Sequence, residues 1–256
     1  GGRKNKEIFM IIDILHSGSS GNACHVYTKK TSILLDCGVS HSKLFIKGKF
    51  PVDAIFVTHE HGDHLGGVGM VARSMNAKVY LEETTFTNIS KNIQLDNCDI
   101  NFIISGDTID MGDFLVEAHE TNHDSKGGIF FIVEDIKSKM RYGHLTDTGI
   151  ITDKMKTGLQ TCDALLLEAN HDVDTLMTHP SYNDWIRERI RGDYGHLSNE
   201  QTMAFIRDHL DLDKLQWIVF GHLSQKTNTP EMVMEAKNEM IPGFGDVFIA
   251  PGIKTL

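Results

Sequence analysis

A short segment of the chain, HEHGDH, brings together four side chains that could bind a metal ion. His59, His61 and His64 offer imidazole nitrogens, and Asp63 offers a carboxylate oxygen. Zn²⁺ takes these ligands in proteins, and Mn²⁺ or Fe²⁺ can share such a site. An apolar run precedes the segment, and Gly62 permits a tight backbone turn between the ligands. The spacing therefore predicts a metal-binding loop directly after a β-strand.

The elements that would position this loop are short apolar runs, which alternate with helical patterns and end in glycine or turn residues. A helix is expected after His64, and another over Asn199–His209, where Ser198 and Gln201 fit a capping box. The apolar runs predict β-strands over Met10–Leu15, Ala23–Tyr27, Ser32–Asp36, Ala54–Thr58, Lys78–Leu81, Phe114–Ala118, Ile129–Val133, Leu165–Glu168 and Trp217–Phe220.

The length of 256 residues fits one α/β domain, and no repeat or Pro/Gly-rich linker divides it. We therefore expect a polar tail over residues 1–7 and a single domain over 8–256, with mixed sheets and helices outside them. Twenty-five basic and 35 acidic residues give a net charge of −10. That balance argues against a passive, charge-driven binder of DNA or membranes. It does not exclude a nuclease, because bound cations would invert the local potential.

Two features bear on the compartment of the protein. The apolar run from Ile8 to Leu15 is too short to span a bilayer and lacks the cleavage site of a signal peptide. The four cysteines are scattered, with no C-x-x-C pair. Both features predict a cytoplasmic protein with reduced thiols. This would be a bacterial cytoplasm, or that of the host if a phage encodes the chain.

The pattern H-x-H-x-D-H resembles the signature of the metallo-β-lactamase fold superfamily. The chain is similar to its phosphodiesterase branch, most of all to the WalJ/YycJ family of small nucleases. It also resembles tRNase Z and the phage anti-Pycsar cyclic nucleotide phosphodiesterases. The resemblance implies an αββα sandwich of two mixed sheets with outer helices. The other matching stretches are SGSSGN from Ser17, NHD from Asn122, HLTDTG from His144, EANHD from Glu168, GHLSN from Gly195 and GHLS from Gly221.

The resemblance further implies a centre of two divalent cations, with zinc favoured and manganese as the alternative. Five imidazoles and two carboxylates would hold them. His119 is the rival of His123 as a ligand, although His123 precedes two glycines as the third histidine of the family does. The first cation would be held by His59, His61 and His123, the second by Asp63, His64 and His222, and Asp147 would bridge both.

Two cations suit the hydrolysis of an anionic phosphodiester. Held about 3.5–4 Å apart, they can lower the pKa of a shared water to about 7, screen the phosphate and hold it in line. The expected reaction is attack of a metal-bridging hydroxide on phosphorus, and the leaving alkoxide then needs a proton. The resemblance to tRNase Z implies that Glu168 and His196 form the proton-donating pair, with Asp63 as the third catalytic residue. Alternatively, Glu168 only orients a histidine, and His196 only makes a supporting contact.

The substrate stays open between two main hypotheses. The WalJ/YycJ resemblance implies a nuclease acting on DNA ends, as a 5′ to 3′ exonuclease. The second hypothesis is a phosphodiesterase that degrades small cyclic nucleotides of immune signalling. The acidic net charge favours the small ligand, because duplex binding uses several phosphate contacts. A thioester or lactone hydrolase and a metal-binding protein without catalysis are further alternatives.

The polar stretch from His171 to Tyr194 has helical character, with Trp185 among the basic residues Arg187, Arg189 and Arg191. It is interpreted either as a solvated surface helix or as a rim that meets an anionic ligand or a second subunit. A homodimer is expected, because the family often pairs its subunits. Near-site candidates are His144, His171 and Asp172, and the turn with Ser19, Ser20 and Asn22, which would touch phosphate or brace the metal loop. Structural roles are expected for His16, His41, His179 and His209.

Overall fold

The computed structural model describes residues 10–40, 44 and 51–256. The predicted tail over 1–7 and His41 lie outside the described residues. Within them the strands form two seven-stranded sheets. The chain forms most of one sheet, then the other sheet, and finally returns to the first. There its last strand pairs with the first strand that the structure describes.

The first sheet has the strand order β14-β1-β2-β3-β4-β5-β6. Strands β14 to β3 pair antiparallel, whereas β3 to β6 pair parallel. Its strands are β1 (Ile11–His16), β2 (Ala23–Tyr27), β3 (Ser32–Leu35), β4 (Ala54–Phe56), β5 (Lys78–Leu81), β6 (Asp99–Phe102) and β14 (Gly252–Thr255).

The second sheet has the order β13-β12-β11-β10-β9-β8-β7. Strands β7 to β10 pair antiparallel and β10 to β13 pair parallel, so this sheet is mixed as well. Its strands are β7 (Thr108–Asp110), β8 (Phe114–Glu120), β9 (Ile129–Asp135), β10 (Arg141–Leu145), β11 (Ala164–Glu168), β12 (Trp217–Gly221) and β13 (Val247–Ile249).

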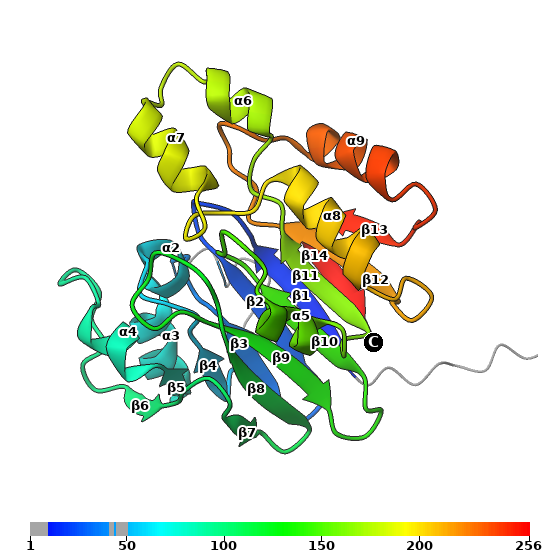
Figure 1. The fold of residues 1–256 in the computed structure, drawn as a ribbon. Helices are drawn as coiled ribbons and strands as arrows, with labels where there is room; N and C mark the ends of the chain where they lie inside the picture. The colour runs from blue at the N-terminus through cyan, green and yellow to red at the C-terminus, as the bar shows by residue number, and fades with distance from the viewer. Residues whose placement is uncertain (1–9, 41–43, 45–50) are drawn as a thin grey trace, which may run out of the picture.

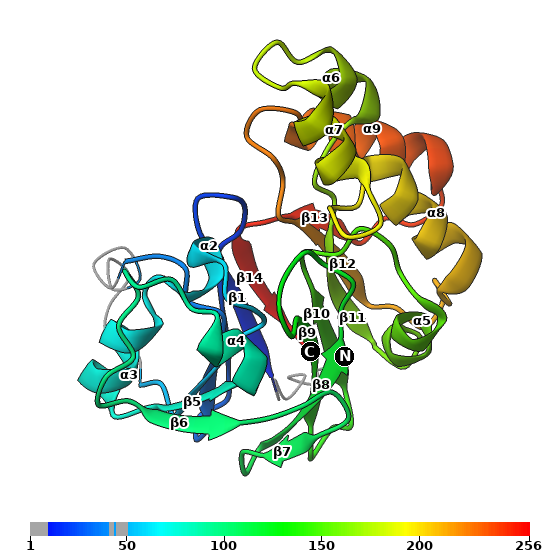
Figure 2. The same cartoon turned by 60° about the vertical axis from the view of Figure 1, so that its left-hand side comes forward.

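Helices cover the outer face of each sheet (Figures 1 and 2). Alternate residues of a strand point to opposite faces, so each sheet contributes to two apolar layers. One core cluster lies between the sheets, and two more lie under the helices on either side. The predicted αββα sandwich is therefore confirmed. The helices are α2 (Gly62–Leu65), α3 (Val68–Met75), α4 (Glu83–Thr87), α5 (Asp153–Leu159), α6 (Val173–Thr178), α7 (Asp184–Arg191), α8 (Asn199–His209) and α9 (Pro230–Met240).

The capping box predicted for α8 is present. The Ser198 hydroxyl accepts from the Gln201 backbone N–H, and the Gln201 side chain accepts in return from the Ser198 N–H. Met203 and Ile206 are buried on the same face of α8, as their helical spacing predicts. This helix packs against the second sheet. Its first turn fixes the end of the preceding loop, which carries His196.

All four cysteines are free thiols, as expected for reduced cysteines. Burial raises the pKa of Cys24, Cys37 and Cys162 to about 12, so these three thiols are unreactive at neutral pH. Among the described residues, no helix has the length and apolar character that a membrane crossing requires.

Candidate metal centre

The predicted ligands all lie where strands end. His59 and His61 follow β4, and α2 carries Asp63 and His64 one turn later. In the second sheet, β8, β10 and β12 run parallel to one another, so their carboxyl ends meet at one edge. That edge is where α/β proteins usually bind ligands. The loops after these three strands carry His123, Asp147 and His222 respectively.

Among the described residues, four overlapping groups of candidate ligands meet at this edge. One joins Asp147 to His59 and His64, and another joins it to Glu168, His196 and His222. The other two match the predicted sites. The ligand atoms of His59, His61 and His123 all lie within 4.8 Å of one another, and His61 Nδ1 is 3.3 Å from His123 Nε2. The ligand atoms of Asp63, His64 and His222 form a second group within the same limit.

Asp147 lies between the two groups. Its carboxylate oxygens are 2.9 Å from His64 Nε2 and 3.5 Å from His222 Nε2, which belong to the second group. They are also 3.8 Å from His123 Nε2 in the first. The structure thus brings all seven predicted ligands together and gives Asp147 the central position expected of a bridging residue.

Polar atoms without partners show that this cluster suits cations. His59 Nε2 and His222 Nε2 are buried and have no hydrogen-bond partner. The opposite nitrogen of each ring is engaged: His59 Nδ1 pairs with the Thr58 hydroxyl at 2.9 Å, and His222 Nδ1 with Glu168 Oε1 at 3.0 Å. Buried polar groups are normally hydrogen-bonded, so two buried ring nitrogens without partners call for a ligand. Imidazole nitrogen with carboxylate oxygen is the donor set of zinc sites.

Carboxylates and carbonyls behind the cluster hold its imidazoles in place. Asp36 Oδ2 is 2.7 Å from His64 Nδ1 and also accepts from the Thr58 hydroxyl. His123 Nδ1 donates to the Gly195 carbonyl at 3.0 Å. Such partners fix the ring orientation and turn Nε2 toward the cluster. Asp36 was not predicted; the available signal was a charged residue directly after the fully buried strand β3.

The backbone around the cluster adopts unusual conformations. Asp36, Asp147 and His222 have φ values of 58°, 55° and 53°, in the left-handed region that non-glycine residues rarely occupy. Such conformations concentrate at functional sites, where the surrounding structure holds them. Close approach matters as well: a Cβ on Gly38 would lie 1.6 Å from the Asp63 carbonyl oxygen, so glycine is required there.

Glu168 and His196 lie next to the cluster, as predicted. Glu168 is fully buried and its Oε1 is 2.7 Å from His196 Nδ1 and 3.0 Å from His222 Nδ1. Its Oε2 accepts from the Thr148 backbone N–H. The His196 side chain retains 22% exposure. Of the pair, only His196 can therefore reach a bound substrate.

Charges within the cluster shift its ionisation. Burial opposes the charged form of Glu168, but His196 and His222 outweigh it and lower the pKa of this carboxyl to about 2. Burial likewise opposes protonation of His222, but Asp147 and Asp63 outweigh it and raise the pKa of the imidazole to about 10. Burial lowers the pKa of His59 and His123, so these imidazoles are neutral. The cluster therefore holds ionised carboxylates beside both protonated and neutral imidazoles. Cations would replace those protons.

The other candidates have different positions. His119 lies on β8, where it pairs with Glu117 and stacks on Phe130, and it belongs to none of the candidate metal groups of the described residues. Asp172 caps α6 through the Thr175 backbone N–H. His171 and His144 are buried beside the cluster without joining a candidate group, and His179 and His209 lie outside those groups too. His16 also belongs to no such group of the described residues.

The glycine-bounded turn braces the metal loop. The Asn22 backbone N–H donates to the Asp63 carbonyl at 2.7 Å, and Asn22 Nδ2 is 2.9 Å from His64 Nε2. Ser19 and Ser20 at the tip of the turn are exposed. Of the two roles expected for this turn, the bracing role has direct contacts.

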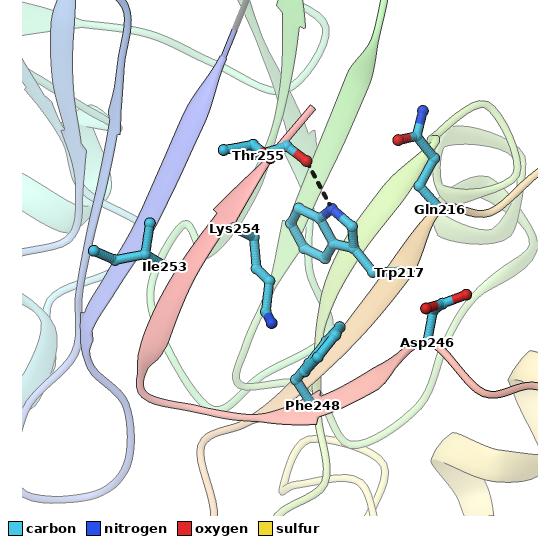
Figure 3. A pocket seen from close by; sticks show the side chains of 7 residues that line it. All are labelled: Gln216, Trp217, Asp246, Phe248, Ile253, Lys254 and Thr255. Carbon is cyan, nitrogen blue, oxygen red and sulfur yellow. Dashed lines mark hydrogen bonds between the residues drawn. The ribbon is translucent and has the colours of Figure 1, made fainter. Parts of the chain in front are cut away.

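A pocket of about 220 Å³ lies far from this centre, at the amino end of β12 and beside β14 (Figure 3). Trp217, the first residue of β12, donates there from Nε1 to the Thr255 carbonyl at 3.2 Å. His222 follows the last residue of the same strand. The pocket therefore lies at the opposite end of β12 from the centre.

Comparisons with known proteins agree with this architecture. A sequence profile described as the Beta-lactamase superfamily domain matches residues 31–212. Exodeoxyribonuclease WalJ of Streptococcus pneumoniae is 36% identical over 237 residues, which cover 88% of this chain and 86% of that protein. Exodeoxyribonuclease YycJ of Bacillus anthracis is 33% identical over 241 residues, covering 91% and 90%. The solved metallo-β-lactamase fold protein YhfI from Bacillus subtilis has a TM-score of 0.71 at 16% identity, covering 96% and 99%.

The fold and the cluster of ligands define a metal-dependent hydrolase of the metallo-β-lactamase superfamily. Within that superfamily, the chain belongs to the family of the exodeoxyribonucleases WalJ and YycJ. The predicted superfamily, family and enzyme class are thus confirmed.

Proposed function

We propose that this chain is a metal-dependent exodeoxyribonuclease that hydrolyses phosphodiester bonds at DNA ends. The observation that carries the proposal is the convergence of seven ligand side chains on one edge of the sandwich, in a chain 36% identical to exodeoxyribonuclease WalJ. Two divalent cations would be bound, with zinc favoured by the imidazole-rich donor set and manganese as the alternative.

The ligand roles follow the two groups. His59, His61 and His123 would hold the first cation, Asp63, His64 and His222 would hold the second, and Asp147 would contribute to both. When bound, the cations would lower the pKa of a water molecule and neutralise charge on the phosphate. Asp63 is 27% exposed, so its carboxylate would also orient the attacking water.

His196 donates the proton that the leaving oxygen needs. Its Nδ1 is bound to Glu168 Oε1, which leaves Nε2 as the nitrogen that donates to substrate. Glu168 holds the ring in that orientation and keeps it protonated, since the carboxylate raises the pKa of His196 against the effect of burial. Because Glu168 is fully buried, it acts as a positioning residue.

Hydrolysis of bis-(p-nitrophenyl) phosphate tests this proposal. We expect turnover with Zn²⁺ or Mn²⁺ that EDTA abolishes. No turnover with any divalent ion would overturn the proposal. The remaining hypotheses would then be a thioester or lactone hydrolase, or a metal-binding protein without catalysis.

The net charge of the chain supports a second candidate substrate, a small cyclic nucleotide. The net charge of −10 is unusual for a duplex-binding protein and favours a small cyclic nucleotide. Incubation with linear duplex DNA labelled at the 5′ or the 3′ end, and separately with cyclic mononucleotides, distinguishes the two. We expect mononucleotides released from the 5′ end. Degradation of cyclic nucleotides alone would replace the nuclease by the second candidate.

Two further expectations stay predictions. A homodimer is tested by sedimentation equilibrium of the purified chain at micromolar concentration. A cytoplasmic location is tested by fractionation of the source cells.

A further inference from the structure

The helices α6 and α7, with the segments joining them, form an arm over residues 173–194. Figures 1 and 2 both show this arm projecting beyond the ends of the sheets. Helix α7 has no buried residue. Most stability of a protein helix comes from packing an apolar face, so an exposed helix held over a candidate active site needs a further explanation.

Contacts at the base of the arm attach it to the loop that carries His123. Asn122 Nδ2 donates to the Asp193 carbonyl at 2.6 Å, and His123 Nδ1 donates to the Gly195 carbonyl. The backbone N–H of His196 donates to the Ile190 carbonyl at 2.7 Å. The end of α7 is therefore held next to the metal centre.

Arginine contacts fix which face of α7 is turned to the centre. Arg187 donates to the His179 carbonyl at 3.1 Å, and Arg191 reaches Met177 on α6, so this side of α7 faces α6. Arg189, two residues from each, points to the opposite side of the helix.

On that opposite side, Arg189 reaches the loop of the metal centre. Its Nε donates to Asp124 Oδ2 at 2.7 Å, and the other oxygen of Asp124 is 3.3 Å from His123 Nε2. The face of α7 that carries Arg189 is therefore the face turned to the centre.

Trp185 shares that face. It precedes Arg189 by four residues, a spacing that places two side chains on one side of a helix about 6 Å apart along its axis. It is 70% exposed, whereas Trp217, the other tryptophan of the chain, is 6% exposed. The two acids of α7 each pair with an arginine three residues later, Asp184 with Arg187 and Glu188 with Arg191.

We propose that Trp185 is a stacking platform for a nucleobase of the DNA strand, next to the phosphodiester held at the metal centre. This rests on the proposed nuclease activity and adds a residue that positions the strand. An exposed indole stacks on any base, and removing such a platform typically weakens binding about 10- to 100-fold. The neighbouring Arg189 guanidinium is paired with Asp124 and remains 56% exposed.

The test compares Trp185→Ala, Trp185→Phe and the unchanged protein, each loaded with zinc. The substrates are duplex DNA with an ordinary terminal nucleotide and the same DNA with abasic terminal nucleotides. Abasic DNA serves as the substrate that lacks a base. It is preferred to bis-(p-nitrophenyl) phosphate for this purpose, because p-nitrophenyl groups can themselves stack on an indole. We expect Trp185→Ala to lower kcat/KM on ordinary DNA about 10- to 100-fold through KM, and Trp185→Phe to restore most of it. On abasic DNA the three proteins should differ by less than about twofold.

Val173→Ala is the matched control, because it removes an exposed apolar side chain from α6 of the same arm. Equal losses on both DNAs, or no loss on either, would overturn the role of Trp185. A shift of Trp185→Ala from dimer to monomer in sedimentation would overturn it too, because a second copy would then cover the indole. Hydrolysis of bis-(p-nitrophenyl) phosphate distinguishes failure of the Trp185 proposal from failure of the proposed nuclease activity. If the unchanged protein does not hydrolyse this compound, the nuclease proposal is refuted.

Discussion

The metal centre and the α6–α7 arm adjoin one another but are built in opposite ways. In the centre, Asp147, Glu168 and His222 are buried, and each contacts other polar groups of the cluster. In the arm, α7 buries no side chain and its charges pair across an exposed surface. The difference indicates a division of labour. On our proposal, the buried cluster performs the chemistry and the exposed arm beside it binds the substrate strand.

The largest expected effect lies in the centre. Asp63→Ala removes a carboxylate ligand, so we expect more than about a 100-fold loss of kcat/KM on bis-(p-nitrophenyl) phosphate. That exceeds the roughly 10–100-fold typical of residues that only orient a ligand. Because Asp63 is partly exposed, the fold should persist in circular dichroism. His209→Ala, at the exposed end of α8, is the control and should keep full activity. Equal losses in both variants would contradict the assignment.

His196→Ala should separate the two kinds of substrate. A positioned general acid contributes about 10²–10⁴-fold, but only where the leaving group needs a proton. We expect a loss of that size on DNA and a much smaller loss on bis-(p-nitrophenyl) phosphate, because p-nitrophenolate leaves unprotonated. Steady-state kinetics on both substrates measures the split. The same loss on both would make His196 a structural residue.

Asp36→Asn tests the support behind the centre. The change removes the charge that faces His64 Nδ1, so we expect zinc affinity to fall about 10- to 100-fold. Isothermal titration with zinc measures it. Asp53→Asn is the matched control, because Asp53 accepts from the Ser32 backbone N–H at the other end of β3. Unchanged affinity in Asp36→Asn would show that the cluster needs no such support.

The smallest effect is expected at the junction of the two regions. Arg189→Ala breaks a pair that is 56% exposed on the arginine side, and such pairs contribute about 0–1 kcal/mol. We expect the free energy of unfolding, measured in urea, to change within that range. Activity on bis-(p-nitrophenyl) phosphate should fall less than about fivefold. A loss as large as that of Asp63→Ala would mean that the arm belongs to the catalytic machinery.

The sequence was informative where several constraints agreed. The run Ala23–Tyr27 is mostly apolar, with His25 as its polar member, and the structure has a strand with those bounds. The capping box of α8 is local chemistry that spacing alone reveals. The clustering of the seven candidate ligands could be predicted because they stand in recognisable motifs at strand ends.

Other features depend on tertiary contacts that no local pattern encodes. Strands β6 and β7 are short and half-exposed, so their apolar signal is weak. Strand β10 begins with a charged residue, Arg141, whose partners Glu117 and Glu134 lie on β8 and β9. Asp36 was missed for the same reason: its role is set by His64, 28 residues away.

The central claim is that seven side chains hold two divalent cations at one edge of the sandwich. Anomalous diffraction from crystals grown with zinc tests it most directly. The account predicts two anomalous peaks, one among His59, His61 and His123 and one among Asp63, His64 and His222, with Asp147 in contact with both. No peak at this edge, or peaks bound only to residues outside this set, would contradict it.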